Sequence, residues 1–352
     1  MKTRILIPAV SLLFNGLILW GASRPSDPVE NFDALWNTFN ERYAFFDLRG
    51  VDWKAQHEKY RPKVTKHTTD EELYGLMCAM LRPLKDGHVN LKAKSLGKKN
   101  AYNPEETPRF FEEFNNGKLE KQFEELVRKT LRYNHFGELK NSTDLLVYSR
   151  NKNLGYLLIT EFEGARPKKL DAALDKVLAS MNGTKGMIID IRLNPGGTDQ
   201  CVYQIASRFA DKKRIGHHRK AKNKPGADGF AELKTRYLKP HEDGDTYLKP
   251  IILLTHDASF SGADVFAMVM AELPQVTIVG EPTNGIFSNM LEKKLPNGWK
   301  YTLSFQVYYS ADMICYEGKG IPVDIPMKNM RGDLEKGEDP LILKALELLS
   351  DK

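Results

Sequence analysis

From about residue 145 onward, short apolar segments alternate with amphipathic segments of helical spacing. The strand-like runs GMIIDI, PIILLTH and QVTIVG are separated by CVYQIASRFA and GADVFAMVMAEL, which have the pattern of helices. Strands that alternate with helices are typical of a largely parallel sheet, because each helix returns the chain to the end of the sheet where the next strand begins. The sequence therefore predicts an α/β sheet-and-helix core over residues 145–352.

The chain before this core carries the start signals of helices. Asp27 marks one helix start, Asp52 marks a second, and Thr69 opens a capping box at a third. These segments predict a helical N-terminal subdomain over residues 24–95. Residues 96–144 form a connecting region that is first rich in turns and then helical.

The first 23 residues differ in composition from the rest. Lys2 and Arg4 precede the apolar run ILIPAVSLLFNGLILWGAS, which ends in small residues and gives way to the polar RPSDPVE. A basic start, an apolar stretch and small residues, in that order, are typical of a secretory signal peptide. The sequence predicts an exported protein, periplasmic or extracellular. If residues 1–23 are retained instead, they are nearly long enough to anchor the protein in a membrane.

Charge and spacing argue against several classes of function. The formal charge of +6 is small for 352 residues and does not indicate a nucleic-acid-binding protein. The stretch 211–248 contains the basic run KKRIGHHRKAKNK, which we interpret as part of a solvated hairpin. No HExxH or other clustered metal-ligand spacing occurs, and no GxGxxG follows a strand, so neither a metal nor a cofactor is expected.

Two serines lie at the strand-to-helix junction DASFSGADVFA, residues 257–267. Ser261 falls at the start of the helix, where free N–H groups and the helix dipole stabilise a developing anion. The amide of Gly262 would be one donor to that anion. Ser261 is equally consistent with a simple helix cap, and Ser259, with His256 nearby, is the competing nucleophile.

Three further loops carry groups that a serine nucleophile needs. DIRLNPGG ends in Gly196 and Gly197, whose backbone N–H groups can approach a ligand closely. His88 in KDGHV is a candidate base, because a serine hydroxyl needs a base near neutral pH. Glu317 in CYEGKGIPVDIP is a candidate for the carboxylate that orients the histidine of a triad. Each loop also has a structural interpretation, as a tight turn or a cap.

Taken together, these loops resemble one family, the tail-specific, C-terminal-processing serine proteases, which also includes the tricorn core protease. GMIIDIRLNPGG, HDASFSGADVFAMVMAELPQVTIVGEPTNG and EGKGIPVDIP are similar to the family's glycine, nucleophile and closing segments. DWKAQHEKYRPKV and LKDGHVNL resemble the helical N-terminal part of its secreted, tricorn-like members. The resemblance implies a crotonase-like core behind a helical subdomain.

The resemblance also implies roles for individual residues. The matching positions are the nucleophile Ser261, the oxyanion donors Gly262 and either Gly196 or Gly197, the histidine His88 and the glutamate Glu317. With these roles, the histidine takes the serine proton and the glutamate orients the imidazolium.

Some positions depart from the family's patterns. The branch that uses a lysine base has GKG after its GExTxG turn, whereas this chain has Ile286 there, so a serine–lysine dyad is not expected. Lys293 and Lys294 fall further on, in a predicted strand. The tricorn branch has a serine before its histidine, and this chain has Gly87, so a water molecule or a direct contact would replace that relay. Residues 95–150 lack the glycine-rich, carboxylate-binding signature of the peptide-binding module that many members insert.

These features predict a secreted serine peptidase that acts on polypeptides. The missing lysine and the missing relay serine motivate an alternative, a protease scaffold retained as a peptide- or glycan-binding protein without turnover. A third hypothesis, an acyl-thioester enzyme on the same core, is disfavoured by the signal peptide, because coenzyme A thioesters are mainly intracellular. A membrane partner is expected only if residues 1–23 are retained.

Overall fold

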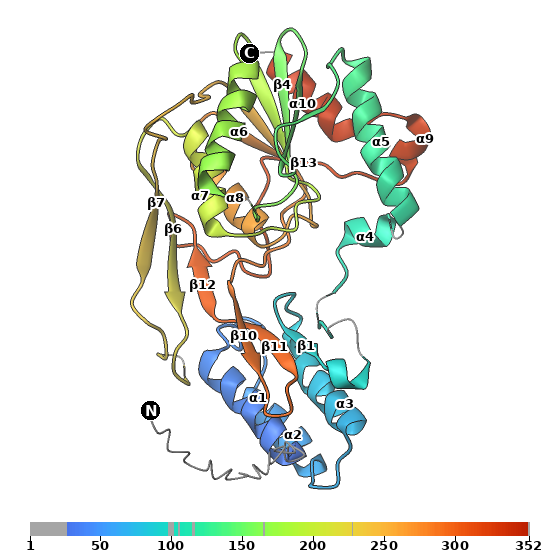
Figure 1. The fold of residues 1–352 in the computed structure, drawn as a ribbon, viewed down its shortest axis with the longest axis vertical. Coiled ribbons are helices and arrows are strands. Elements are labelled where there is room, and N and C mark those ends of the chain that lie inside the picture. Colours follow the sequence, from blue (N-terminus) through green and yellow to red (C-terminus); the bar gives the residue numbers. More distant parts are fainter. Residues whose placement is uncertain are drawn as a thin grey trace, which may run out of the picture.

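The computed structural model describes residues 27–97, 102–104, 106–114, 117–164, 166–226 and 228–350. The predicted signal peptide at residues 1–23 lies outside the described residues. A larger α/β part lies above a smaller helical part in Figure 1. Among the described residues, no helix is both long enough and apolar enough to cross a membrane.

Helices come first along the chain, and the alternation of strands and helices follows from β3 onward. The α-helices of the described chain are α1 (Pro28–Arg42), α2 (Trp53–Tyr60), α3 (Asp70–Leu81), α4 (Arg109–Glu113), α5 (Gly117–Tyr133), α6 (Pro167–Ser180), α7 (Asp199–Ala206), α8 (Gly262–Met270), α9 (Gly332–Lys336) and α10 (Pro340–Ser350). The strands are β1 (Asn90–Lys92), β2 (Lys140–Asn141), β3 (Leu146–Arg150), β4 (Leu154–Ile159), β5 (Gly186–Asp190), β6 (Arg214–Ala221), β7 (Lys234–Leu238), β8 (Ile251–Thr255), β9 (Val276–Gly280), β10 (Met290–Lys294), β11 (Lys300–Ser304), β12 (Gln306–Tyr309) and β13 (Ile325–Pro326).

The α/β part is built on a seven-stranded sheet with the strand order β13-β9-β8-β5-β4-β3-β2. Strands β4, β5, β8, β9 and β13 run parallel, and β3 and β2 add an antiparallel edge. In the centre, Ile189 of β5 pairs with Leu157 of β4 and Leu253 of β8. The prediction of an α/β fold with a largely parallel sheet is confirmed.

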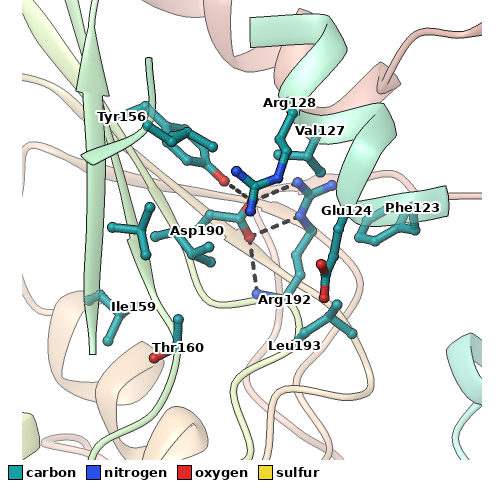
Figure 2. Close-up of a pocket in the computed structure, with 13 residues that line it drawn as sticks. Phe123, Glu124, Val127, Arg128, Tyr156, Ile159, Thr160, Asp190, Arg192 and Leu193 are labelled. Carbon is teal, nitrogen blue, oxygen red and sulfur yellow. Dashed lines mark hydrogen bonds and ion pairs between the residues drawn. The ribbon is translucent and has the colours of Figure 1, made fainter. Parts of the chain in front are cut away.

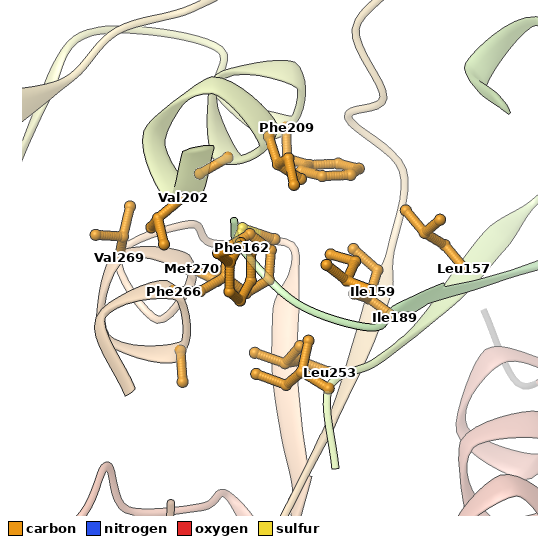
Figure 3. Packing of buried hydrophobic residues seen from close by; sticks show 14 of the residues in the cluster. Leu157, Ile159, Phe162, Ile189, Val202, Phe209, Leu253, Phe266, Val269 and Met270 are labelled. Atoms are coloured by element: carbon orange, nitrogen blue, oxygen red, sulfur yellow. The ribbon is translucent and has the colours of Figure 1, made fainter. Parts of the chain in front are cut away.

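Helices cover both faces of this sheet. Helices α6, α7 and α8 pack on one face, where Phe209 and Phe266 share a core with Ile189 (Figure 3). Helices α5 and α10 pack on the other face, in a second core that contains Ile188 and Ile252. Successive side chains of a strand point to opposite faces. Because both faces are covered, β5 is apolar at nearly every position.

The helical part combines early and late segments of the chain. Helices α1, α2 and α3 begin after the caps Asp27, Asp52 and Thr69, as predicted. Their apolar faces share one core with β10 and β11. Leu303 of β11 and Trp299, directly before that strand, are buried in this core. A sheet with the order β1-β11-β10 joins these late strands to β1, which follows α3. The chain therefore returns to the helical part after building most of the sheet, and loops of both parts meet between them.

The basic stretch 211–248 contains the hairpin β6–β7, to which β12 adds a third strand. The hairpin runs along one side of the molecule, from the α/β part toward the helical part (Figure 1). The predicted hairpin is confirmed, but it is not wholly solvated. Two of its arginines, Arg219 and Arg236, line the cleft that also contains Ser261.

Candidate active site

Ser261 lies between β8 and α8, directly before the first helical residue. Its backbone has φ +53° and ψ −109°, a conformation that residues with side chains rarely adopt and that costs on the order of 1–3 kcal/mol. The side chain forms no capping hydrogen bond with the helix. The structure therefore does not use the Ser261 hydroxyl as a helix cap, and it places this residue on the wall of a cleft.

The competing serine, Ser259, is fully buried and its hydroxyl is engaged. It donates to the carbonyl oxygen of Ile191 at 2.9 Å and accepts from the backbone N–H of His256 at 3.3 Å. The His256 ring accepts from the N–H of Ala258 and stacks on Phe110. Burial lowers the pKa of His256 well below its usual value. Ser259 and His256 thus hold the loop together and do not form a serine–histidine pair.

The glycine turn after β5 packs directly against the backbone of Ser261. A Cβ atom on Gly196 would lie 2.6 Å from the amide nitrogen of Gly262 and 2.7 Å from the Cβ of Ser261. A Cβ atom on Gly262 would lie 2.8 Å from the amide nitrogen of Gly197. This close approach requires glycine at positions 196 and 262, and it brings two backbone amides beside the serine.

Hydrogen bonding distinguishes between the two glycines of the turn. The N–H of Gly196 donates to Oδ1 of Asn194 at 2.8 Å, so that amide is already engaged. In the described part of the chain, no hydrogen bond takes up the N–H of Gly197 or of Gly262. Gly197 and Gly262 are therefore the two amides available to an oxyanion beside Ser261.

The turn is held by buried charges at the end of β5. The Arg192 guanidinium bonds to both oxygens of Asp190, at 3.0 and 2.6 Å, and to Oδ2 of Asp339 at 2.7 Å. Figure 2 shows Asp190 between Arg192 and the hydroxyl of Tyr156. Tyr156, Asp190 and Arg192 line a cavity of about 290 Å³ beneath α5, and none of the predicted catalytic residues lines it. Asp190 and Arg192 thus anchor the segment that positions the glycine amides.

His88 lies on the loop between α3 and β1 and is almost fully buried. Its backbone N–H donates to Asp86, and its carbonyl accepts from Thr302 of β11. Burial lowers the pKa of His88, while the charge of Asp86 and a hydrogen bond with the Ser288 backbone raise it to a smaller extent. Nδ1 of the ring has no hydrogen-bond partner among the described residues, and no hydrogen bond joins this ring to Ser261.

Glu317 is buried as well, and its carboxylate contacts the backbone instead of His88. Oε2 accepts from the N–H of Phe287 at 3.0 Å, and Oε1 lies 3.8 Å from Nη2 of Arg49. Burial, together with the negative charge of Asp86, raises the pKa of Glu317 well above its usual value. Within the described residues Oε1 accepts no hydrogen bond. The structure therefore brings Glu317 close to the loop of the site without forming the predicted contact with His88.

Another buried carboxylate, that of Asp264, fixes the loop that follows β9. Asp264 of α8 accepts from the N–H groups of Gly285 and Ile286, at 2.7 and 3.2 Å. Burial raises the pKa of Asp264 to about 6, because these hydrogen bonds only partly offset the loss of solvent. The Ile286 side chain lines the same cleft as Ser261. The cleft therefore contains isoleucine where the lysine branch of the family has its base. Lys293 and Lys294 lie exposed on β10, in agreement with the predicted strand.

A cleft of about 680 Å³ brings several of these residues together between the two parts of the molecule. Of the predicted site residues, it is lined by His88, Gly196, Gly197 and Ser261. Glu317 and Gly262 are buried behind its wall. Four predicted site residues from three separate loops therefore share one solvent-accessible space.

The comparisons with known proteins decide the family. The family model described as "Peptidase family S41" matches residues 153–327, and the model of the "Tricorn protease C1 domain" matches residues 25–82. The chain belongs to peptidase family S41. Members of this family are serine peptidases, and the resemblance to C-terminal-processing proteases is confirmed.

Curated relatives of the S41 family match the chain over part of their length. The carboxy-terminal processing protease CtpA of Bacillus subtilis is 29% identical over 177 residues, which are 50% of this chain and 35% of that protein. The carboxy-terminal-processing protease of Bartonella bacilliformis is 26% identical over 223 residues, 60% of this chain and 49% of that protein. The chain thus spans about a third to a half of these relatives.

Solved structures are similar over nearly the whole chain. A candidate peptidase from Parabacteroides merdae has a TM-score of 0.77 and 29% identity, and the match covers 92% of this chain and 97% of that one. Mature CPAF bound to lactacystin has a TM-score of 0.63 at 11% identity, over 92% of this chain and 97% of that one. The similarity to CPAF concerns the fold alone, and it agrees with the predicted crotonase-like α/β core behind a helical subdomain.

Several residues of this S41 site were not singled out in the sequence. Asp86, two positions before His88, is the carboxylate whose charge acts on the histidine, and Tyr43 bonds to it at 2.9 Å. Asp264 directly follows the segment Ser-Gly-Ala, but no sequence motif indicates the role of its side chain. Arg219 and Arg236 belong to the basic stretch 211–248, for which the sequence predicts a solvated hairpin. Their roles depend on which segments the fold brings together, and the local sequence carries no signal of that.

Proposed function

We propose that this protein hydrolyses peptide bonds in polypeptides, with Ser261 as the nucleophile and His88 as its base. The observation that carries the proposal is the arrangement around Ser261. Its side chain does not cap the helix, it stands on a strained turn, and it lies against the free amides of Gly197 and Gly262. A serine held in this way, in a cleft that also contains a histidine, fits acyl transfer.

The reaction proceeds through two attacks on one carbonyl carbon. Ser261 Oγ attacks the scissile carbonyl while His88 accepts the hydroxyl proton, and the amides of Gly197 and Gly262 stabilise the oxyanion. The His88 imidazolium then gives its proton to the departing amine, and the C–N bond breaks. Water, deprotonated by His88, then attacks the acyl carbon. The bond to Ser261 Oγ breaks as His88 returns the proton to that oxygen, which releases the carboxylic acid and restores both residues.

A histidine base is preferred to a lysine because of what lines the cleft. Ile286 occupies the position at which the lysine branch has its base, and among the described residues no lysine lines the cleft. Lys293 and Lys294 are exposed on β10. His88 lines this wall, and burial, which lowers its pKa, favours the neutral imidazole that a general base requires.

Glu317 is assigned the role of orienting His88. Nδ1 of His88 and Oε1 of Glu317 are both buried and both lack a hydrogen-bond partner in the described chain. Catalytic hydrogen bonds are often long in the free enzyme and shorten when substrate binds. We assign these two atoms to each other in the substrate complex, directly or through one water molecule in place of the relay serine that Gly87 replaces.

The proposed setting is outside the cytoplasm. The signal-like residues 1–23 support export to the periplasm or the extracellular space, and the processing proteases among the relatives fit a polypeptide substrate.

The alternative of a peptide-binding scaffold without turnover is favoured by one observation, the absence of a hydrogen bond from His88 to Ser261 or Glu317 in the described residues.

The test is to incubate the mature protein with an unfolded protein and to identify products by mass spectrometry. Ser261→Ala and Ser259→Ala variants are assayed in parallel. We expect cleavage by the parent and by Ser259→Ala but not by Ser261→Ala. Cleavage by Ser261→Ala would refute the assigned nucleophile. Binding of peptides without cleavage by the folded parent would support the scaffold alternative.

A further inference from the structure

One wall of the cleft carries two arginines from the β6–β7 hairpin. We propose that Arg236, supported by Arg219, binds a carboxylate of the polypeptide substrate and so sets the specificity of the enzyme. The inference rests on the proposed peptidase function and adds the kind of substrate group that the site selects. That group is either the C-terminal carboxylate of the chain or an acidic side chain.

Both arginines have a defined place beside the nucleophile. Arg219 lies on β6 and Arg236 on the neighbouring β7, which pair in antiparallel register. Their side chains line the same cleft as Ser261 and His88, and each is about one-third exposed, at 31% and 33%. Both side chains are therefore accessible to a bound peptide although they are partly buried.

Arg236 is held in place mainly by an aromatic ring. Its guanidinium lies 4.1 Å from the ring centroid of Tyr203, whose hydroxyl bonds to Nδ1 of His217 at 2.8 Å. Burial lowers the pKa of His217 to about 3, so this support stays neutral at working pH. A guanidinium stacked on a ring keeps its N–H groups in the plane, directed away from the ring face. Arg236 is thus pre-organised, with donors that remain available.

The hydrogen bonds separate the roles of the two arginines. Nη1 of Arg219 donates to Oδ2 of Asp199 and to the hydroxyl of Tyr308, at 3.0 and 3.1 Å. The Arg236 guanidinium makes no hydrogen bond within the described part of the chain, and its Nη1 is 3.5 Å from the same Asp199 oxygen. That oxygen also accepts from Tyr308 at 3.0 Å. Arg219 is therefore the structural partner of Asp199, and Arg236 is the group with unused donors.

The charges on the cleft wall favour one orientation of an anionic substrate. Asp199 is a single carboxylate facing two guanidinium groups, so this wall keeps one net positive charge. The other carboxylates that line the cleft, Glu161 and Glu163, flank Phe162, whose backbone bonds to Gly196 beside the oxyanion turn. A substrate carboxylate is repelled there and attracted to the arginine wall. Planar, two-pronged recognition of a carboxylate is the interaction that arginine makes best.

The test compares matched peptides that differ in one carboxylate. One pair has a free C-terminal carboxylate or a C-terminal amide, and the second pair, amidated in both members, has Asp or Asn within the cleaved region. The readout is the ratio of kcat/KM within each pair, for the wild type, Arg236→Gln and Arg236→Lys. Lys234→Gln, an exposed charge change on the same strand, is the control.

We expect the wild type and Lys234→Gln to prefer the carboxylate member of one pair by about 10- to 100-fold, the range of a charge-assisted hydrogen bond. The pair that shows the preference identifies its source. Arg236→Gln should reduce the ratio to about one, and Arg236→Lys should keep only part of it because it lacks the planar fork. A wild-type ratio near one in both pairs, or a preference that survives Arg236→Gln in a folded protein, would overturn the proposal.

Binding measurements keep this result separate from the peptidase assignment. The same peptide pairs are titrated against Ser261→Ala, with and without Arg236→Gln, and thermal unfolding confirms that each variant is folded. Selective binding of the carboxylate peptide that depends on Arg236, with no turnover by the parent, would support the carboxylate site and refute the catalytic role. Turnover by the parent without any such selectivity would support the catalytic role and refute the carboxylate site.

Discussion

Gly196 approaches Gly262 so closely that a methyl group on Gly196 would lie 2.6 Å from the Gly262 amide nitrogen. The two glycines come from loops more than sixty positions apart, one after β5 and the other at the start of α8. Their contact places the Gly197 and Gly262 amides beside Ser261. The proposed oxyanion site is thus a property of two packed loops.

Gly196→Ala should therefore reduce peptidase activity strongly. The added methyl group displaces the turn from Gly262, and loss of one oxyanion donor typically costs on the order of 10²–10³ in kcat. Gly183→Ala is the matched control. Gly183 has the same kind of backbone, with φ +82° against +96° for Gly196, but a Cβ atom there meets nothing within 4 Å. Both variants bear the backbone strain, so equal losses of kcat/KM would contradict the oxyanion assignment.

The pH dependence of kcat/KM should report His88. A general base works only when neutral, and burial lowers the pKa of His88. Activity should therefore persist on acidification past the usual histidine value of about 6.5 and fall only below it. The measurement is kcat/KM between about pH 4 and pH 9, with the exposed His67→Gln as a control that leaves the profile unchanged. An acid limb centred above about pH 7 would exclude this histidine.

The Glu317→Gln variant should distinguish between two roles of Glu317, orientation of His88 and support of the loop. The amide oxygen of glutamine can still accept from Phe287, and burial, which raises the pKa of Glu317, already disfavours a charge on this side chain. The unfolding temperature should therefore not fall, whereas kcat should fall by about 10²–10⁴ if the carboxylate stabilises the imidazolium. Glu335→Gln, at an exposed position, is the control. Unchanged kcat in the Glu317 variant would leave that residue a loop support only.

Arg192→Met should destabilise the protein far more than a surface change. Without the guanidinium, Asp190 and Asp339 are left as buried charges without their partner, which costs about 3–5 kcal/mol of unfolding free energy. Arg132→Met is the comparison, because Arg132 lies 4.0 Å from Glu125 in an exposed pair worth about 0–1 kcal/mol. Urea unfolding followed by circular dichroism measures both. Similar losses in the two variants would show that the buried cluster does not anchor the turn.

Much of the architecture could be predicted because its signals are local. The caps at Asp27 and Thr69 and the apolar strand GMIIDI depend on residues a few positions apart, and the structure agrees with all three. The path of β10 and β11 into the core of the helical part could not be predicted in this way. A strand with an exposed polar face, such as β10, carries no local information about the segment it joins.

The candidate site shows the same division. Ser261, His88 and the glycine pair could be located, because short motifs and a family resemblance mark them. The choice of Gly197 over Gly196 depends on a hydrogen bond that the Gly196 N–H donates to the Asn194 side chain, and no motif records that bond. The position of Arg236 in the cleft depends on how the β6–β7 hairpin packs against α7. Predictions from sequence therefore failed where an interaction between distant segments decides the role of a residue.

The most direct test of the account is the site at which a fluorophosphonate reacts with the protein. The serine oxygen displaces fluoride from phosphorus only when a base activates it, so the labelled residue identifies the nucleophile. Mass spectrometry of the digested adduct should place the label on Ser261, and His88→Ala should slow labelling strongly. A label on Ser259, or no label on a folded protein that cleaves polypeptides, would contradict the assignment of Ser261.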